Sequence, residues 1–78
     1  MSAAGLLEEL ARQLVDEQDA VRIEEVDESD ELILRLHVAE ADRGKVIGRQ
    51  GRIARALRTI VRACAARERR RVRLEIVD

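Results

Sequence analysis

Gly44-Lys45-Val46-Ile47-Gly48-Arg49-Gln50-Gly51-Arg52-Ile53 is the stretch that decides the fold of this 78-residue chain. Within it, Gly48 and Gly51 bracket a polar dipeptide, and apolar residues lie on both sides. Glycine adopts left-handed backbone angles freely, and a glycine after an apolar helical turn commonly ends the helix. The pattern therefore predicts a short helix that stops at Gly48, a tight loop, and a second helix that begins just beyond Gly51.

The second helix is predicted to run to about Arg67. Apolar side chains recur along it at helical spacing and are expected to face the core: Ile53, Leu57, Ile60, Val61 and Cys64. On this interpretation Cys64 is a small buried hydrophobe and not a reactive thiol. A series of arginines follows another side of the same helix: Arg52, Arg55, Arg58 and Arg62.

An anion is the expected occupant of the glycine loop. No acidic residue lies between Arg43 and Arg67, and the free N–H groups at a helix start attract anions. Arg52 and Arg55 would lie in the first turn, where the helix dipole disfavours cations unless they meet an anion. For the other two arginines of the series, a solvated helix face is an equally good interpretation.

The segments around this centre follow two periodicities. Ser2 is predicted to cap a helix over residues 3–16. Alternation of apolar and polar residues predicts a short strand from Val21, a strand over residues 32–38 and a last strand over residues 72–76. Leucines recur at helical spacing in the first helix: Leu6, Leu7, Leu10 and Leu14.

The predicted order is helix, strand, strand, short helix, long helix, strand. It predicts an α+β fold, a two-layer sandwich of a three-stranded sheet with three helices on one face, as a single domain over residues 1–78. The first two strands, joined by the polar turn Asp27–Asp30, would form an antiparallel hairpin. Gly44 costs the short helix about 1 kcal/mol relative to alanine, and we interpret it as a position of close packing.

The two halves of the chain carry opposite charge. Residues 1–42 hold 13 acidic and 3 basic side chains, whereas residues 43–78 hold 12 basic and 3 acidic ones, so the net charge is only −1. A basic half favours a polyanionic partner. Alternatively, the acidic and basic surfaces pair within the fold or across a dimer.

Composition and motifs argue against several classes of protein. One cysteine and one histidine exclude an internal disulfide and a Cys/His zinc site, and no cofactor is expected. No segment approaches the roughly 20 apolar residues of a membrane span, and the N-terminus lacks the features of a signal peptide, so we expect a cytoplasmic protein. The Walker A and dinucleotide glycine motifs are absent, and no nucleophile lies beside a base near His37, so catalysis is not expected.

Residues 46–53 resemble the V-I-G-x-x-G core of the KH domain, an RNA-binding module whose G-x-x-G loop clamps the backbone of four nucleotides. The predicted order of elements resembles the type II, prokaryotic form of that fold. The whole length is similar to the small stand-alone bacterial KH proteins of the KhpA kind. The resemblance implies a non-enzymatic RNA chaperone or post-transcriptional regulator that forms a homodimer and pairs with a larger KH-containing protein.

Transferred to this chain, the resemblance implies a site for single-stranded RNA around the loop. Gly48 and Gly51 would let the RNA backbone approach, while Arg49 and Gln50 would meet phosphates. The other implied positions are neighbours of the loop and the basic turn before the last strand: Lys45, Ile47, Arg52, Ile53, Ala54, Arg55, Leu57, Arg69, Arg70, Arg71 and Arg73. Of these, Leu57 is the residue best explained as core.

Two further expectations concern how the site works. Because the chain has no aromatic residue, bases cannot stack as they do on an RRM, so modest affinity and weak sequence preference are expected. The alternative function is a protein–protein assembly module that uses the KH fold mainly for dimerisation or partner binding. The acidic half of the chain favours that alternative, and the basic loop favours RNA.

Overall fold

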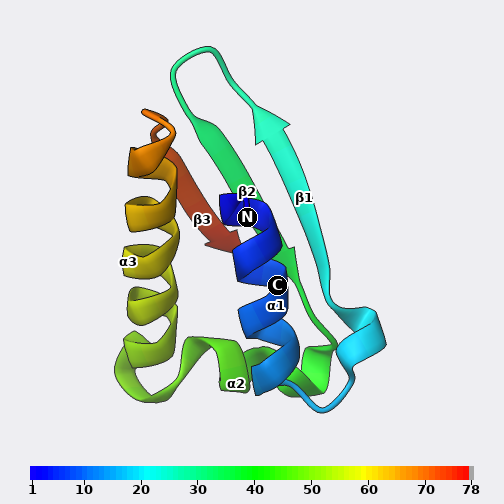
Figure 1. The fold of residues 1–78 in the computed structure, drawn as a ribbon. Coiled ribbons are helices and arrows are strands. Elements are labelled where there is room, and N and C mark those ends of the chain that lie inside the picture. The colour runs from blue at the N-terminus through cyan, green and yellow to red at the C-terminus, as the bar shows by residue number, and fades with distance from the viewer. Residues whose placement is uncertain (78) are drawn as a thin grey trace.

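The computed structural model describes residues 1–77 as a three-stranded sheet with helices against one face (Figure 1). The predicted α+β order, α-β-β-α-α-β, is confirmed. The helices and strands are α1 (Ala3–Leu14), β1 (Arg22–Asp27), β2 (Leu32–His37), α2 (Arg43–Ile47), α3 (Arg52–Arg67) and β3 (Val72–Ile76). Short 3-10 turns connect them: η1 (Gln18–Ala20), η2 (Glu40–Asp42) and η3 (Arg49–Gly51). None of the helices within the described residues is long and apolar enough to cross a membrane.

The sheet is mixed, with strand order β1-β2-β3. β1 and β2 form the predicted antiparallel hairpin, and β3 lies parallel to β2 at the edge beside α3 (Figure 1). β1 is longer than the sequence predicts, because pairing continues to Asp27 opposite Leu32. The β1–β2 turn and the α3–β3 turn therefore lie at the same end of the sheet, while the glycine loop lies at the opposite end of α3 (Figure 1).

The core is aliphatic and lies between the sheet and the two long helices. Its most deeply buried members are Leu7, Ala11, Leu34, Leu36, Val46, Val61, Ala65 and Leu74. Through Val46, α2 also packs into this core. This short helix closes one end of the helix layer (Figure 1).

Two apolar residues predicted to face the core are exposed instead, and Cys64 packs against the core without being fully buried. Leu14 is 37% exposed and Ile60 is 39% exposed, and Cys64 is partly exposed, with its thiol 3.7 Å from the carbonyl oxygen of Met1. Neighbouring residues of a helix point about 100° apart, so Ile60 cannot share the direction of the fully buried Val61. The small residues Ala11 and Ala65 occupy core positions instead.

The predicted cap of α1 and the predicted end of α2 at Gly48 are confirmed, whereas α1 ends at Leu14 and not at residue 16, and the prediction for Gly44 is wrong. The backbone N–H of Gly5 donates to the Ser2 hydroxyl at 3.0 Å, which is the predicted cap of α1. Gly48 ends α2 by donating its N–H to the carbonyl oxygen of Gly44 at 2.9 Å. Gly44 itself is exposed, and a Cβ there would have no neighbour within 4 Å. It is not a close-packing position.

Candidate nucleic-acid interface

The glycine loop turns sharply because three of its four residues have positive φ. Gly48 has φ 76° and ψ 170°, Gln50 has φ 57°, and Gly51 has φ 73°. The N–H of Gly51 donates to the carbonyl oxygen of Gly48 at 3.1 Å and closes the turn. The predicted helix, tight loop and helix are thus confirmed.

The two glycines are required for different reasons. A Cβ on Gly48 would lie 2.6 Å from Cγ1 of Ile53 and 2.9 Å from its backbone nitrogen, so Ile53 packs directly on the loop. A Cβ on Gly51 would meet nothing within 4 Å, and only the left-handed φ favours glycine there. Gly51 is also the N-cap of α3 and has no side chain to cover the first turn. That turn is open to an approaching anion.

Cations surround the loop and remain available. Arg49 and Gln50 are exposed at its tip, and a guanidinium N–H of Arg52 donates to the side-chain oxygen of Gln50 at 3.3 Å. Among the ion pairs within residues 1–77, none involves Arg49, Arg52 or Arg55. These guanidinium groups can therefore meet phosphates without first breaking an internal pair.

Lys45 is placed differently from the other predicted cations. Its ammonium group donates to Asp16 at 2.8 Å and to Asp42 at 3.1 Å, and both contacts raise the pKa of Lys45. Asp42 is only 2% exposed and also accepts the backbone N–H of Glu17 at 3.0 Å. That N–H is the main cause of a lowered pKa for Asp42, with Lys45 adding to it. Lys45 thus joins α2 to the end of α1, and phosphate would have to compete with two carboxylates for it.

Of the predicted apolar positions, only Ile47 offers a large exposed surface, at 37%. Ala54 and Leu57 are each 4% exposed, and Leu57 belongs to the core cluster, as predicted for it. Ile53 lies on the α1 side of α3, where it lines a hollow with Leu10 and Leu14. The structure therefore does not bring Ile53 to the side of α3 that faces β3.

The arginines Arg55, Arg58 and Arg62 lie on one side of α3, because residues at i, i+3 and i+7 share a helix face. We call them the arginine row. It leads from the glycine loop toward the edge strand β3. Arg62, for which the sequence left a solvated face equally plausible, lines a hollow beside β3. Its spacing of seven from Arg55 is the sequence signal that could have identified it.

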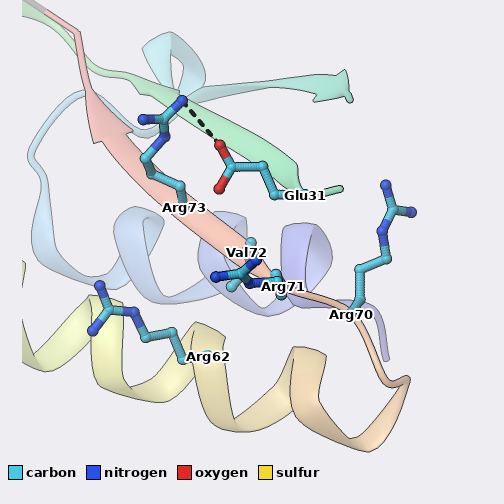
Figure 2. Close-up of a pocket in the computed structure, with 6 residues that line it drawn as sticks. All are labelled: Glu31, Arg62, Arg70, Arg71, Val72 and Arg73. Carbon is cyan, nitrogen blue, oxygen red and sulfur yellow. Dashed lines mark ion pairs between the residues drawn. The ribbon is translucent and has the colours of Figure 1, made fainter. Parts of the chain in front are cut away.

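The hollow at the far end of the row has a volume of about 380 Å³ (Figure 2). We call it the β3 hollow; its lining residues are Glu31, Arg62, Arg70, Arg71, Val72 and Arg73. Figure 2 shows the guanidinium groups of Arg62 and Arg71 on the same side of β3, and Arg73 beside Glu31. Arg73 pairs with Glu31 at 3.1 Å. Glu31 lies in the β1–β2 turn and is not among the residues predicted for the site.

The basic residues implied before and in the last strand (Arg69, Arg70, Arg71 and Arg73) are only partly brought together. The structure brings Arg71 and Arg73 to the β3 hollow together with Arg62. Arg70 extends away from them (Figure 2) and pairs with Asp27 in the hairpin. Arg69 is exposed, with φ 57°, in the tight turn after α3.

The chemistry of this surface is that of polyanion binding. A loop with an open helix start continues into the arginine row and ends at a cationic hollow, so one strand of phosphates could follow it.

Residues 1–77 contain no group of three His, Cys, Asp or Glu side chains that could hold a metal ion. His37 pairs with Glu24 at 3.3 Å on the face of the sheet away from the helices.

Comparison with known proteins places this surface in context. A protein-family model described as "KhpA/KhpB, KH domain" matches residues 4–76. The RNA-binding protein KhpA of Borreliella burgdorferi is 49% identical over 73 residues, which cover 94% of this chain and 89% of that protein. The RNA-binding protein KhpA of Clostridium acetobutylicum is 51% identical over 72 residues, covering 92% and 96%, and that of Aquifex aeolicus is 48% identical over the full length of both chains. No solved structure matches significantly.

Proposed function

The chain belongs to the KhpA/KhpB family of KH domains, a non-enzymatic RNA-binding family, and we propose that it grips single-stranded RNA through its glycine loop. The sugar–phosphate backbone would lie across Gly48 to Gly51, and the strand would continue along the arginine row. The named relatives support RNA binding itself. The site on this chain is our inference from geometry.

One observation carries the proposal most strongly: the loop combines a helix start that has no capping side chain with arginines that no carboxylate among residues 1–77 neutralises. Gly51 is the bare N-cap of α3, and Arg49, Arg52 and Arg55 surround it without an ion pair inside residues 1–77. A phosphate would meet open N–H groups and cations together. The role we propose is that of a cytoplasmic RNA chaperone or post-transcriptional regulator.

Salt dependence tests whether the basic surface is the site. Four clamped nucleotides present roughly three or four phosphates, and each phosphate contacted on a single strand contributes about −0.7 to the slope of log affinity against log salt. We therefore expect a slope of about −2 to −3 for a short single-stranded RNA, measured by fluorescence anisotropy. Affinity that stays constant between dilute and physiological salt would show that the arginines do not meet the phosphates.

A second surface supports self-association. Partly or fully exposed apolar side chains of α1 and α3 form a band: Leu6, Leu10, Leu14, Ile53, Ile60 and Cys64. The two helices together line hollows in this band. Contiguous exposed apolar surface on a small domain marks an interaction site, and a domain of this length gains stability by covering it. We propose that the band joins two copies in a homodimer and is also available to a larger KH-containing protein.

Ile60 gives the direct test of this band. Ile60→Asp places a carboxylate at its centre, and we expect the dimer to dissociate because burying an unpaired charge is strongly unfavourable. Ala66→Asp is the matched control, since Ala66 is exposed on the same helix outside the band. Light scattering at micromolar concentration should report a monomer for the first variant and a dimer for the second. A wild-type protein that is monomeric over a wide concentration range would remove the dimer proposal.

A further inference from the structure

Glu31 is an unexpected residue in the β3 hollow. All the other charged residues that line the hollow are arginines, and the Glu31 side chain is 33% exposed. A carboxylate repels phosphate, so a hollow that only held the RNA backbone would bind better without it. Glu31 therefore gives the hollow an acceptor that suits a hydrogen-bond donor and not a phosphate.

The carboxylate of Glu31 is held but not saturated. Its Oε1 lies 3.1 Å from a guanidinium nitrogen of Arg73, while Oε2 accepts no hydrogen bond from residues 1–77. An ionised carboxylate accepts about four hydrogen bonds and is acceptor-only. Glu31 can therefore accept two parallel N–H donors while Arg73 orients it.

We propose that the β3 hollow is a guanine-recognition subsite, in which Glu31 accepts hydrogen bonds from the Watson–Crick edge of the base. This proposal rests on the proposed RNA-binding function and names the base that this part of the site selects. Guanine is the RNA base that presents two adjacent N–H donors on that edge, N1–H and the N2 amino group. Adenine and cytosine offer one amino group, and uracil offers one N–H between two carbonyl oxygens that a carboxylate repels.

The surroundings of Glu31 suit a nucleotide. A volume of about 380 Å³ falls in the range of roughly 300–1,000 Å³ that is typical of small-ligand sites. Arg62 and Arg71 enter from the α3 side and the turn (Figure 2), where they can bind the phosphates of the same nucleotide. Arg52, beside the loop, and Arg62 are about 15 Å apart along α3, at about 1.5 Å per residue. The subsite thus lies beyond the nucleotides that the loop would hold.

The test compares short oligonucleotides that differ at one base. The probes are seven-residue RNAs: all uridine, or uridine with a central guanosine, adenosine or inosine. Wild-type protein should bind the guanosine probe roughly five- to tenfold more tightly than the all-uridine probe. This is the low end of the discrimination that a bidentate base contact provides, because the hollow is open to solvent. Inosine lacks the N2 amino group and should lose most of that preference.

Glu31→Gln should abolish the preference for guanosine, because the amide has only one acceptor oxygen where the carboxylate has two. Binding of the all-uridine probe should not weaken. Asp30→Asn is the matched control: it removes one carboxylate from the same turn, but Asp30 does not line the hollow, so the preference should stay. Equal wild-type binding of guanosine and uridine probes overturns the guanine subsite and leaves the proposed RNA-binding function standing. Equal effects of the two variants also overturn it. Failure to bind any probe overturns both proposals.

Discussion

Gly48→Ala should destabilise the domain severely, whereas Gly51→Ala should be tolerated. At Gly48 the backbone lies at φ 76° and ψ 170°, a region that is essentially restricted to glycine and costs another residue about 1–3 kcal/mol. The new methyl group would also overlap Ile53, 2.6 Å away, and displacing a packed side chain costs about 1–3 kcal/mol more. A domain of this length is stable by only about 4–12 kcal/mol at the usual value per residue.

Urea unfolding of the two variants measures this difference. At Gly51 a Cβ has free space, so alanine there costs only the left-handed φ, about 1–2 kcal/mol. The midpoint for Gly48→Ala should therefore fall much further than the midpoint for Gly51→Ala. Equal losses would show that the contact between Gly48 and Ile53 does not limit the side chain at position 48.

The second large effect concerns RNA. The double substitution Arg49→Asp and Gln50→Asp should weaken RNA binding by about one to two orders of magnitude, because like charges placed opposite each other cost up to several kcal/mol. The fold should tolerate it: both side chains are exposed, and aspartate is enriched at positive φ, the conformation of Gln50 at 57°. Circular dichroism and the oligomeric state should match those of the wild type.

A charge-matched control separates local from overall charge effects. Gln18→Asp and Arg22→Asp produce the same change in net charge, at exposed positions in η1 and β1. β1 is the edge strand opposite β3, so this variant should keep most of the RNA affinity. If the loop variant retains full affinity, the glycine loop is not the RNA site. If it loses RNA yet still performs the cellular role, the protein acts as an assembly module, and Ile60→Asp becomes the decisive variant.

The features that the sequence by itself determined are those set by neighbouring residues. Backbone preference at Gly48 ended α2, the Ser2 hydroxyl capped α1, and alternation predicted β2 and β3. Each depends on contacts within a few residues, so periodicity and local chemistry suffice to predict it. The α+β order and the helix–loop–helix of the site followed from these elements.

Tertiary structure decided which charges remain free and which apolar side chains stay exposed. Lys45 was predicted as a loop cation, but it meets Asp16, 29 residues earlier in the chain. Arg70 was predicted at the RNA site, but it meets Asp27, 43 residues earlier. Packing likewise buried Ala65 and left Ile60 exposed, although the sequence pattern of α3 predicted Ile60 and not Ala65 to face the core. A side chain's partner across such separations depends on how the sheet and helices are arranged in space. The local sequence pattern assigns a residue to a helix or strand, but only tertiary packing determines which residues its side chain contacts.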